Sequence, residues 1–434
     1  MRRVAGRSAA SIAASVETQL ASGAVAPGDV LPTVRDLARK LGVSPATVAA
    51  AYRLLRSRGL ASGFGRRGTR VAARPSLPTP VSLAVADGTV DLASGNPDPA
   101  LLPPLDPALR TLHGGQVLYA PTSEPLLPFA AAEFEADEIP ARATAVVSGA
   151  LDGIERILRE HVRVGDHVGI EDPSFGGIVA LVSACGCVPT PIALDEYGPT
   201  PEAVDHALKQ GCRAIIVTPR AQNPTGAAVS AERAADLRRV LRRRSDVVLI
   251  ENDYMAPIAG AQFFSLRAGP RERWAVVRST SKFLGPDLRV AVMAGDELTI
   301  SRVRARQALG ARWVSHLLQQ VVFALWSDPS SGRRLARAME IYSQRRRALQ
   351  AALDGHGIGI RAHSGFNVWV PVRDEARVVH ALADRGWAVA AGEPFRIRSA
   401  PAIRVTASML EPPDAVRFAG DLAETLRFSR STPV

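Results

Sequence analysis

The sequence predicts an α/β protein with a large and a small domain, preceded by a small basic module of helices and two short strands. Positive charge is concentrated near the N-terminus, prolines interrupt the chain around residues 75–80, and beyond residue 91 short apolar runs alternate with helical patterns. Residues 1–80 carry thirteen Lys or Arg against three Asp or Glu, which accounts for +10 of the chain's net charge of +11. This distribution indicates that only the first module meets a polyanion.

The N-terminal module is predicted to contain three helices and a wing. An apolar residue recurs every four positions from Ile12 to Leu20, which indicates one face of a first helix. A second helix fits residues 33–41, and a third follows Ser44, a natural N-cap. The stretch LASGFGRRGTRVA then gives two short strands around residues 63–68. Two helices joined by a tight turn form the helix-turn-helix pattern, whose second helix enters the major groove of DNA.

The motifs LPTVR, TVAAAYRLL and GRRGTRV resemble those of the winged helix of GntR-type bacterial regulators. The resemblance covers most of residues 8–72 and implies that the partner is a double-stranded DNA operator. A helical domain with a merely solvated basic face is the alternative, but it leaves the coincidence of charge, turn and wing unexplained. The chain departs from the family at Pro45, where many members have an arginine. The resemblance implies that the residues facing DNA are Arg35, Thr47, Arg53, Arg67, Gly68 and Thr69.

The domain boundaries follow from composition and periodicity. The prolines of AARPSLPTPVS deny regular hydrogen bonding, so a semi-rigid linker over residues 75–90 is expected after a DNA-binding domain over residues 1–74. The runs TAVVS, HVGIE, AIIVT, VVLIE and WAVVRS predict a largely parallel sheet in a large domain over residues 91–325. Two helical stretches and two later strands indicate a smaller α+β domain over residues 326–434. Ligands of such sheets bind at the carboxyl ends of the strands.

Lys282 is the residue that most clearly points to chemistry. It is one of three lysines, with Lys40 and Lys209, in a chain that has fifty arginines. Because arginine would meet a need for charge alone, Lys282 is a candidate for work that requires an amine able to lose its proton. Formation of a Schiff base is such work.

The surroundings of Lys282 suit pyridoxal phosphate, which requires an amine, anion-binding groups, a partner for its pyridine nitrogen and donors at its phenolic oxygen. Hydroxyl groups and an arginine flank the lysine, and SGALD ends a strand and opens a helix, so that its amides provide a further phosphate site. The phosphate ligands predicted in this way are Ser279, Ser281, Arg289 and the amides of Ala150 and Leu151.

Other candidate ligands follow other strands. NPTG places Asn223 on a tight turn, ENDY places Asn252, Asp253 and Tyr254 after a strand, and EDPSF places Phe175 where its ring can stack on the cofactor. Each motif alone is weak. In this order, and each at a strand end, the motifs resemble those of the fold-type I, aspartate aminotransferase-like proteins that bind pyridoxal phosphate, over roughly residue 91 to the C-terminus.

This second resemblance implies a role for each residue. Lys282 forms the Schiff base, Arg289 and Ser279 bind the phosphate, Asn223 and Tyr254 reach the phenolic oxygen, and Phe175 stacks on the ring. Arg404, in IRVTAS, matches the arginine that binds a substrate carboxylate, and here it is expected to bind an effector.

The family usually has EDDY where this chain has ENDY, and its first aspartate pairs with the pyridine nitrogen. If Asn252 faces that nitrogen, the pyridinium is less favoured and electron-sink chemistry weakens. Alternatively, a one-residue shift lets Asp253 serve. The sequence leaves both arrangements open.

A winged helix joined to an aminotransferase-like domain is the arrangement of MocR-type regulators, a GntR subfamily, which the chain resembles over nearly its whole length. The resemblance implies a homodimeric transcriptional regulator whose cofactor domain senses an amine, an amino acid or pyridoxal phosphate itself. The alternatives are a catalytically active aminotransferase with an appended DNA-binding domain, and a DNA-binding protein whose second domain has lost its ligand. Asn252 disfavours efficient transamination, whereas Lys282, Arg289 and Arg404 disfavour loss of the ligand.

The remaining composition is that of a cytoplasmic protein. No apolar run approaches the roughly twenty residues of a membrane span, and no signal-peptide core is present at the N-terminus. The three cysteines have no nearby histidine at the spacing of a zinc site, so no metal is expected. We expect the cysteines to be buried free thiols. They are Cys185, Cys187 and Cys212.

Overall fold

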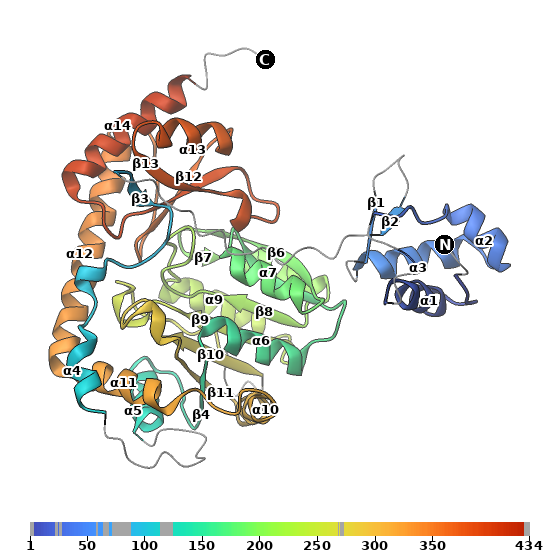
Figure 1. Ribbon diagram of the computed structural model, residues 1–434, viewed down its shortest axis with the longest axis horizontal. Helices are drawn as coiled ribbons and strands as arrows, with labels where there is room; N and C mark the ends of the chain where they lie inside the picture. The colour runs from blue at the N-terminus through green and yellow to red at the C-terminus, as the bar shows by residue number, and fades with distance from the viewer. Residues whose placement is uncertain are drawn as a thin grey trace.

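The computed structural model describes residues 4–21, 25, 28–57, 60–63, 69–71, 88–112, 125–267, 269 and 273–428. The predicted fold class, an α/β protein preceded by a winged helix-turn-helix, is confirmed (Figure 1). The predicted linker over residues 75–90 lies, up to residue 87, outside the described residues.

In the N-terminal module, three helices share one apolar core and a β-hairpin follows them. The elements are α1 (Ala9–Ala21), α2 (Val34–Leu41), α3 (Pro45–Ser57), β1 (Ala61–Gly63) and β2 (Thr69–Val71). Ile12 and Val16 of α1 pack with Tyr52 and Leu55 of α3, as the apolar spacing predicts. β1 and β2 pair antiparallel and form the base of the wing.

Local signals in the sequence fix the ends of α2 and the start of α3. The hydroxyl of Thr33 accepts a hydrogen bond from the amide of Asp36 at 3.2 Å, which caps α2. Gly42 ends this helix with φ 64°, a left-handed conformation that favours glycine. The hydroxyl of Ser44 then accepts from the amide of Thr47 at 3.1 Å, which caps α3. The tight turn between α2 and α3 therefore has the geometry that the sequence predicts.

The large domain is built on an eight-stranded sheet in the order β4-β11-β10-β9-β8-β5-β6-β7. β11 and β7 run antiparallel to their neighbours, and the other strands are parallel to one another. The strands are β4 (Ala143–Val147), β5 (His167–Asp172), β6 (Val188–Asp195), β7 (Gly198–Pro199), β8 (Ala214–Val217), β9 (Val248–Asp253), β10 (Trp274–Ser279) and β11 (Ala291–Gly295). All five strands predicted for this domain are present.

Helices cover both faces of this sheet. Apolar residues of α6, α7 and α10 pack on one face, and those of α5, α8, α9 and α11 pack on the other. The helices are α4 (Leu105–Arg110), α5 (Leu126–Ala136), α6 (Ala150–His161), α7 (Gly176–Ala184), α8 (Pro201–Lys209), α9 (Ala231–Leu241), α10 (Glu297–Ala308) and α11 (His316–Ser327). Short 3-10 turns are η2 (Pro99–Leu101), η3 (Ala256–Ile258) and η4 (Pro286–Leu288).

The small domain has a four-stranded sheet in the order β12-β14-β13-β3. Its elements are β3 (Val90–Leu92), α12 (Pro329–Asp354), β12 (Asn367–Pro371), α13 (Glu375–Ala383), β13 (Trp387–Ala391), η5 (Glu393–Phe395), β14 (Ala402–Thr406) and α14 (Pro412–Phe428). The long helix α12 contributes Tyr342 to the core of the large domain and Leu349 to that of the small domain. It therefore joins the two.

The fold differs from the sequence prediction in its strands, because β6, β7, β11 and β13 are not predicted and β3 lies elsewhere than expected. β3 pairs in parallel with β13, so residues 90–92 belong to the small domain's sheet, whereas the prediction divides them between the linker and the large domain. β6 is absent from the prediction because Pro189 and Pro191 argue against a strand. Both prolines lie where β6 pairs with β5 alone, since β7 pairs only with Leu194 and Asp195. The missing N–H groups are therefore tolerated.

Candidate functional site

The carboxyl ends of β4 and β10 and the amino end of the antiparallel strand β11 bring the predicted phosphate ligands to one edge of the sheet. β11 lies between β4 and β10, and Ala291 pairs with both Val147 and Ser279. The segment that starts α6, the loop that carries the lysine, and Arg289 therefore all emerge at the same place.

Arg289 lies against the N-terminus of α6. A Cβ atom added to Gly149, the N-cap residue of α6, would lie 2.8 Å from Nη2 of Arg289, so the guanidinium group approaches the backbone closely there. Gly149 also has φ 97°. The first amides of a helix, here those of Ala150 and Leu151, have no acceptor within the helix and favour an anion. The guanidinium group and these amides thus form one anion-binding corner.

The two serines that precede the lysine complete this corner. Ser279 and Ser281 are buried, and the amide of Ser281 donates to Oγ of Ser279 at 3.3 Å. Oγ of Ser281 is buried and has no hydrogen-bond partner among the described residues. An orphaned buried hydroxyl on the loop that carries the lysine fits a phosphate oxygen.

The amine of Lys282 lies beneath the segment that follows β3. Its Nζ donates to the carbonyl of Gly95 at 2.7 Å and lies 3.3 Å from Oδ1 of Asn96. Burial, together with the nearby positive charges of Arg404 and Arg289, lowers the pKa of Lys282 to about 8. A substantial fraction of the lysine is therefore neutral, and nucleophilic, near physiological pH.

Sequence reasoning missed Gly95 and Asn96. Gly95 has φ 67°, and a Cβ there would lie 3.0 Å from Nη1 of Arg404. In the sequence, these residues lie in a Ser-Gly-Asn-Pro stretch after a short strand, a pattern that indicates only a turn. Their contact with Lys282 follows from the position of the small domain, which the sequence does not give.

Arg404 is the second cation beside the lysine. Its side chain is 4% exposed, and burial lowers its pKa to about 10. Nη2 donates to the carbonyl of Ala93, Nη1 lies 3.4 Å from Oδ1 of Asn223, and the guanidinium carbon stands 4.7 Å from the ring centroid of Phe395. Nε has no partner, and Arg404 forms no ion pair with the described carboxylates. It is a buried cation suited to a ligand's carboxylate.

Strand alternation separates Asn252 from Asp253. Side chains along a strand point to opposite faces, so Asn252 shares the face of Ile250 and Val277, on which α6 packs. Ser279, two residues beyond Val277, lies on that face too. Asp253 points to the opposite face, where α5 packs.

Asp253 is committed to an ion-pair cluster on that opposite face. Its carboxylate accepts from Nε of Arg220 at 2.8 Å and from Nε of Arg278 at 2.7 Å, and both arginines also contact Asp137. Burial raises the pKa of Asp253, but the two arginines outweigh it and lower the pKa to about 2. The structure thus does not bring Asp253 to the site, and Arg220 and Arg278 are structural partners that the sequence analysis missed.

Asn252 remains on the face of the site. It is 6% exposed, and its Oδ1 has no hydrogen-bond partner within the described part of the chain. A buried orphan acceptor is rare in folded proteins and indicates a ligand or water at that position. The amide carries no charge, in contrast to a carboxylate.

The other predicted ligands have protein partners. The hydroxyl of Tyr254 donates to the carbonyl of Ala221 at 2.7 Å. Asn223, from the same loop, contacts Arg404 as described above. Phe175 is the N-cap residue of α7 and is 39% exposed, and its ring lies over Gly177, where a Cβ would be 2.5 Å from Cε1.

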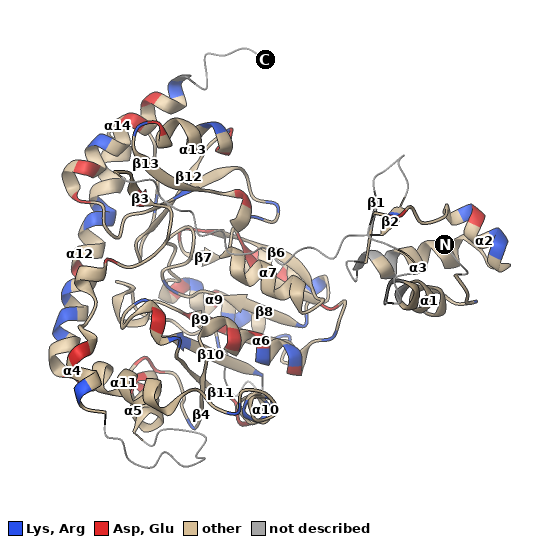
Figure 2. Ribbon diagram, in the orientation of Figure 1, with Lys and Arg blue, Asp and Glu red and all other residues tan. Residues whose placement is uncertain are grey.

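In the N-terminal module, the described candidates lie on the helix-turn-helix and the wing. Arg35 is exposed on α2, as are Arg39 and Lys40 of the same helix, and Figure 2 shows blue, basic segments on this helix. Thr47 is half-buried in the first turn of α3, and Thr69 begins β2. Arg53 is on α3. The predicted wing residues Arg67 and Gly68 lie outside the described residues.

Comparison with known proteins agrees with both parts of the chain. Residues 8–71 match the model of the bacterial regulatory proteins of the gntR family, and residues 88–419 match that of aminotransferase class I and II, a family that depends on pyridoxal phosphate. The chain therefore belongs to the MocR-type regulators of the GntR family, with a winged helix-turn-helix fused to a fold-type I aminotransferase-like domain. Members of this family bind DNA through the first of these domains.

Two related regulators extend over most of the chain. The vitamin B6 salvage pathway transcriptional repressor PtsJ of Salmonella typhimurium is 40% identical over 97% of this chain and 99% of its own. The pyridoxine biosynthesis transcriptional regulator PdxR of Corynebacterium glutamicum is 26% identical over 87% of this chain and 88% of its own.

Solved aminotransferases share the fold of the second part. LysN, an alpha-aminoadipate aminotransferase from Thermus thermophilus complexed with N-(5'-phosphopyridoxyl)-L-leucine, is 22% identical with a TM-score of 0.70, covering 79% of this chain and 93% of its own. A kynurenine aminotransferase from Pyrococcus horikoshii in complex with PMP gives 19% identity and a TM-score of 0.72, with 80% and 93% covered. Among the described segments, no helix combines the length and hydrophobicity that a bilayer span requires.

The depressed pKa of Lys282 predicts selective reactivity. In protein without cofactor, the rate of acylation of Lys282 by an amine reagent should reach half its maximum near pH 8, well below the ordinary lysine value of about 10.4. Peptide mass spectrometry at a series of pH values measures this rate. Replacing Arg404 by Gln removes a repelling charge, so the midpoint should move upward. A midpoint near 10 in the unmodified protein would contradict the electrostatics described for the site.

Proposed function

We propose that this protein is a transcriptional regulator that holds pyridoxal phosphate on Lys282 and binds an operator through residues 1–74. The proposal rests above all on one observation, the buried amine of Lys282, which donates to the carbonyl of Gly95 and whose pKa is lowered to about 8 by burial and by the charges of Arg404 and Arg289. The signal is an amine, an amino acid or pyridoxal phosphate itself. An operator as partner puts the protein in the cytoplasm.

The residues present fit the cofactor. Arg289, Ser279, Ser281 and the first amides of α6 bind the phosphate, and the orphaned hydroxyl of Ser281 and the tight approach of Arg289 to Gly149 support this role. Phe175 stacks on the ring. When bound, pyridoxal phosphate supplies an aldehyde carbon that exchanges one amine for another.

Asn223 and Tyr254 lie where the phenolic oxygen is expected, and each must exchange a protein partner for the cofactor. The hydroxyl of Tyr254 turns from the carbonyl of Ala221, and the side chain of Asn223 turns from Arg404. Both movements are rotations of a side chain. They link the state of the cofactor to the loop that contains Ala221 and Asn223.

Asn252 makes the domain a sensor rather than an efficient enzyme. It faces the pyridine nitrogen, because Asp253 is held by Arg220 and Arg278 on the other face of the sheet. A neutral amide does not stabilise a protonated pyridine as a carboxylate does. Amine exchange at the aldehyde carbon does not need that proton, whereas the electron withdrawal of transamination does.

Arg404 gives the site a preference for amines that carry a carboxylate. Such a ligand neutralises a buried cation that has no ion pair in the described part of the chain. Its amine then replaces Lys282, which frees the lysine for its contacts with Gly95 and Asn96. A ligand that binds one of two arrangements of the protein more tightly than the other shifts their populations. If the two arrangements bind DNA differently, the affinity for DNA changes as well. The working unit is a homodimer, since fold-type I sites are built between two subunits.

Cofactor attachment should be specific to Lys282. Purified protein with pyridoxal phosphate should absorb visible light, and after borohydride reduction one cofactor should remain attached to the Lys282 peptide. The Lys282→Ala variant should lose this attachment, and Lys209→Ala, which removes an exposed lysine on α8, should keep it. Cofactor fixed to Lys209 or Lys40 in the unmodified protein would rule out the assignment.

Replacing Asn252 by Asp should raise transamination. A carboxylate at this position forms a charge-assisted hydrogen bond to the pyridinium, which is worth about a tenfold or greater gain in rate. The measurement is keto acid formation from a panel of amino acids with a keto acid acceptor, with operator binding followed in parallel. Rapid multiple turnovers by the unmodified protein, without a change in DNA affinity, would favour the alternative of an aminotransferase with a DNA-binding appendage.

Arg35 should contribute to DNA binding through a phosphate contact. The Arg35→Gln variant should bind the operator more weakly, and the slope of log affinity against log salt should fall by about 1. Lys209→Gln, a charge change on the large domain, is the matched control and should leave both quantities unaltered. Operator binding by Arg35→Gln that equals that of the control would remove Arg35 from the interface.

A further inference from the structure

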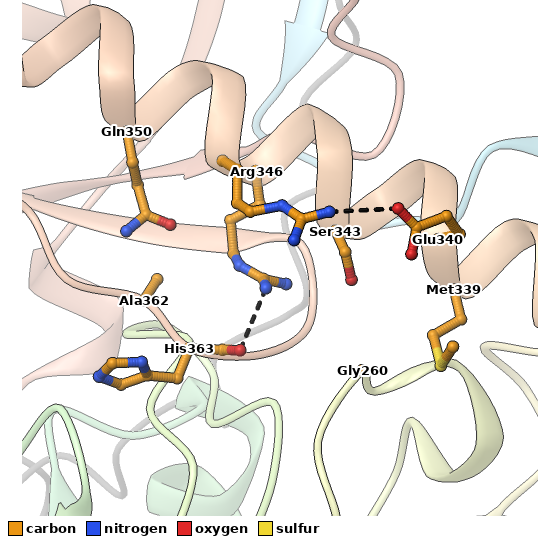
Figure 3. Close-up of a pocket in the computed structure, with 9 residues that line it drawn as sticks. Gly260, Met339, Glu340, Ser343, Arg346, Gln350, Ala362 and His363 are labelled. Carbon is orange, nitrogen blue, oxygen red and sulfur yellow. Dashed lines mark hydrogen bonds and ion pairs between the residues drawn. The ribbon is translucent and has the colours of Figure 1, made fainter.

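A pocket of about 510 Å³ lies apart from the Lys282 site, between α12 and two loops (Figure 3). α12 lines it with Ser343, Arg346, Arg347 and Gln350, and His363 faces them from the loop before β12. Its volume is in the range of small-molecule sites.

The charge in this pocket is not balanced. Arg346 is 5% exposed, donates to the carbonyls of His363 at 3.1 Å and of Gly365, and makes no ion pair with the described carboxylates. Burial, together with the charge of neighbouring Arg347, lowers its pKa to about 10. Arg347 is paired at 3.2 Å with Glu340, so the lining has two guanidinium groups and one carboxylate. A buried cation without a counter-charge favours binding of an anion.

Two buried polar atoms of the lining also have no hydrogen-bond partner. They are Nε of Arg346 and Oε1 of Gln350, although Nε2 of Gln350 contacts the carbonyl of Ile360 at 3.3 Å. Nε of Arg346 is a donor and suits an anion, whereas Oε1 of Gln350 is an acceptor and requires a donor, such as a hydroxyl group of the ligand. Ser343 and His363 supply further polar groups around the same space, and the ring of His363 is held by stacking on Tyr197, with centroids 5.1 Å apart.

We propose that this pocket binds a small phosphate-bearing metabolite as a second ligand, separate from the cofactor. The guanidinium groups of Arg346 and Arg347 and the hydroxyl of Ser343, all on α12, suit the several oxygens of a phosphate. The arginines of α12 follow one another along its length (Figure 2), but those at 346 and 347 are the ones that line the pocket.

The pocket is connected to the cofactor site through the loop over residues 362–366. Arg346 holds the carbonyls of this loop, whose amides at His363 and Ser364 donate to the carbonyl of Gly226 at 2.8 and 2.9 Å. Oγ of Ser364 accepts from the amide of Ala221 at 2.6 Å, and the carbonyl of Ala221 accepts from Tyr254. An anion on Arg346 therefore acts on the loop that faces the cofactor, and provides a second regulatory input.

The test is calorimetric titration of the full-length protein with inorganic phosphate at constant ionic strength, with chloride as the reference salt. Borohydride reduction fixes the cofactor on Lys282 and keeps the Arg289 site filled, and removal of excess free pyridoxal phosphate leaves the other sites open to the titration. Unmodified protein should bind phosphate, and Arg347→Gln should bind it about tenfold more weakly through loss of a charge-assisted hydrogen bond. Arg347 is largely exposed, so its replacement spares the fold. Arg337→Gln, an exposed change elsewhere on α12, should bind like the unmodified protein.

Either of two results would overturn the proposal: no phosphate binding above the chloride reference, or equal binding by Arg347→Gln and Arg337→Gln. Visible absorbance reports on the cofactor independently. If it showed that Lys282 carries no cofactor, the proposed function would fail, and the titration would be repeated with Arg289→Gln to remove the other phosphate site. Loss of binding on replacing Arg347 would still support the pocket.

Discussion

The convergence of Lys282, Arg289 and Arg404 is the constraint on which this site depends. Three cations lie close together, and within the described ranges none of them pairs with a carboxylate. Mutual repulsion and burial make the lysine give up its proton easily, which is what an amine nucleophile requires. The same charges leave the two arginines in need of anions, and we propose that a cofactor phosphate and a ligand carboxylate provide them. One cluster of positive charges therefore accounts for the reactivity of the lysine and for the proposed binding of a phosphate and a carboxylate.

The face of the sheet to which each side chain of β9 points then determines which residue meets the cofactor. With Asp253 turned to Arg220 and Arg278, the ion pairs that hold α5 against the sheet use the carboxylate that the cofactor would otherwise engage. Asn252 is left on the cofactor face. Binding and exchange of amines remain possible while catalysis is weakened, and this is the combination that a regulator needs. The pocket at Arg346 adds a second input through the loop that contacts Ala221 and Gly226.

Features set by local sequence could be predicted, and those set by distant contacts could not. The caps at Thr33 and Ser44, the glycine at the end of α2, and the strand ends that carry Lys282 follow from nearby residues. To choose between Asn252 and Asp253, one must know which face of the sheet each side chain occupies. One must also know that Asp253 pairs with arginines that are distant in the sequence. Gly95 and Asn96 reach Lys282 only because β3 joins the small domain's sheet, a parallel pairing with β13 nearly three hundred residues away. Residue spacing has no information about such contacts.

The central claim is that events at Lys282 are transmitted to DNA. The most direct measurement is operator affinity for the protein without cofactor, with pyridoxal phosphate, and with pyridoxal phosphate plus aminooxyacetate, an amine-like carboxylate that displaces the lysine. The account predicts that at least one of these steps changes operator affinity by about 5- to 150-fold, the usual range of coupling between two sites, and that Lys282→Ala loses the response. Equal operator affinity in all three states, with absorbance showing that the cofactor is bound and displaced, would contradict it.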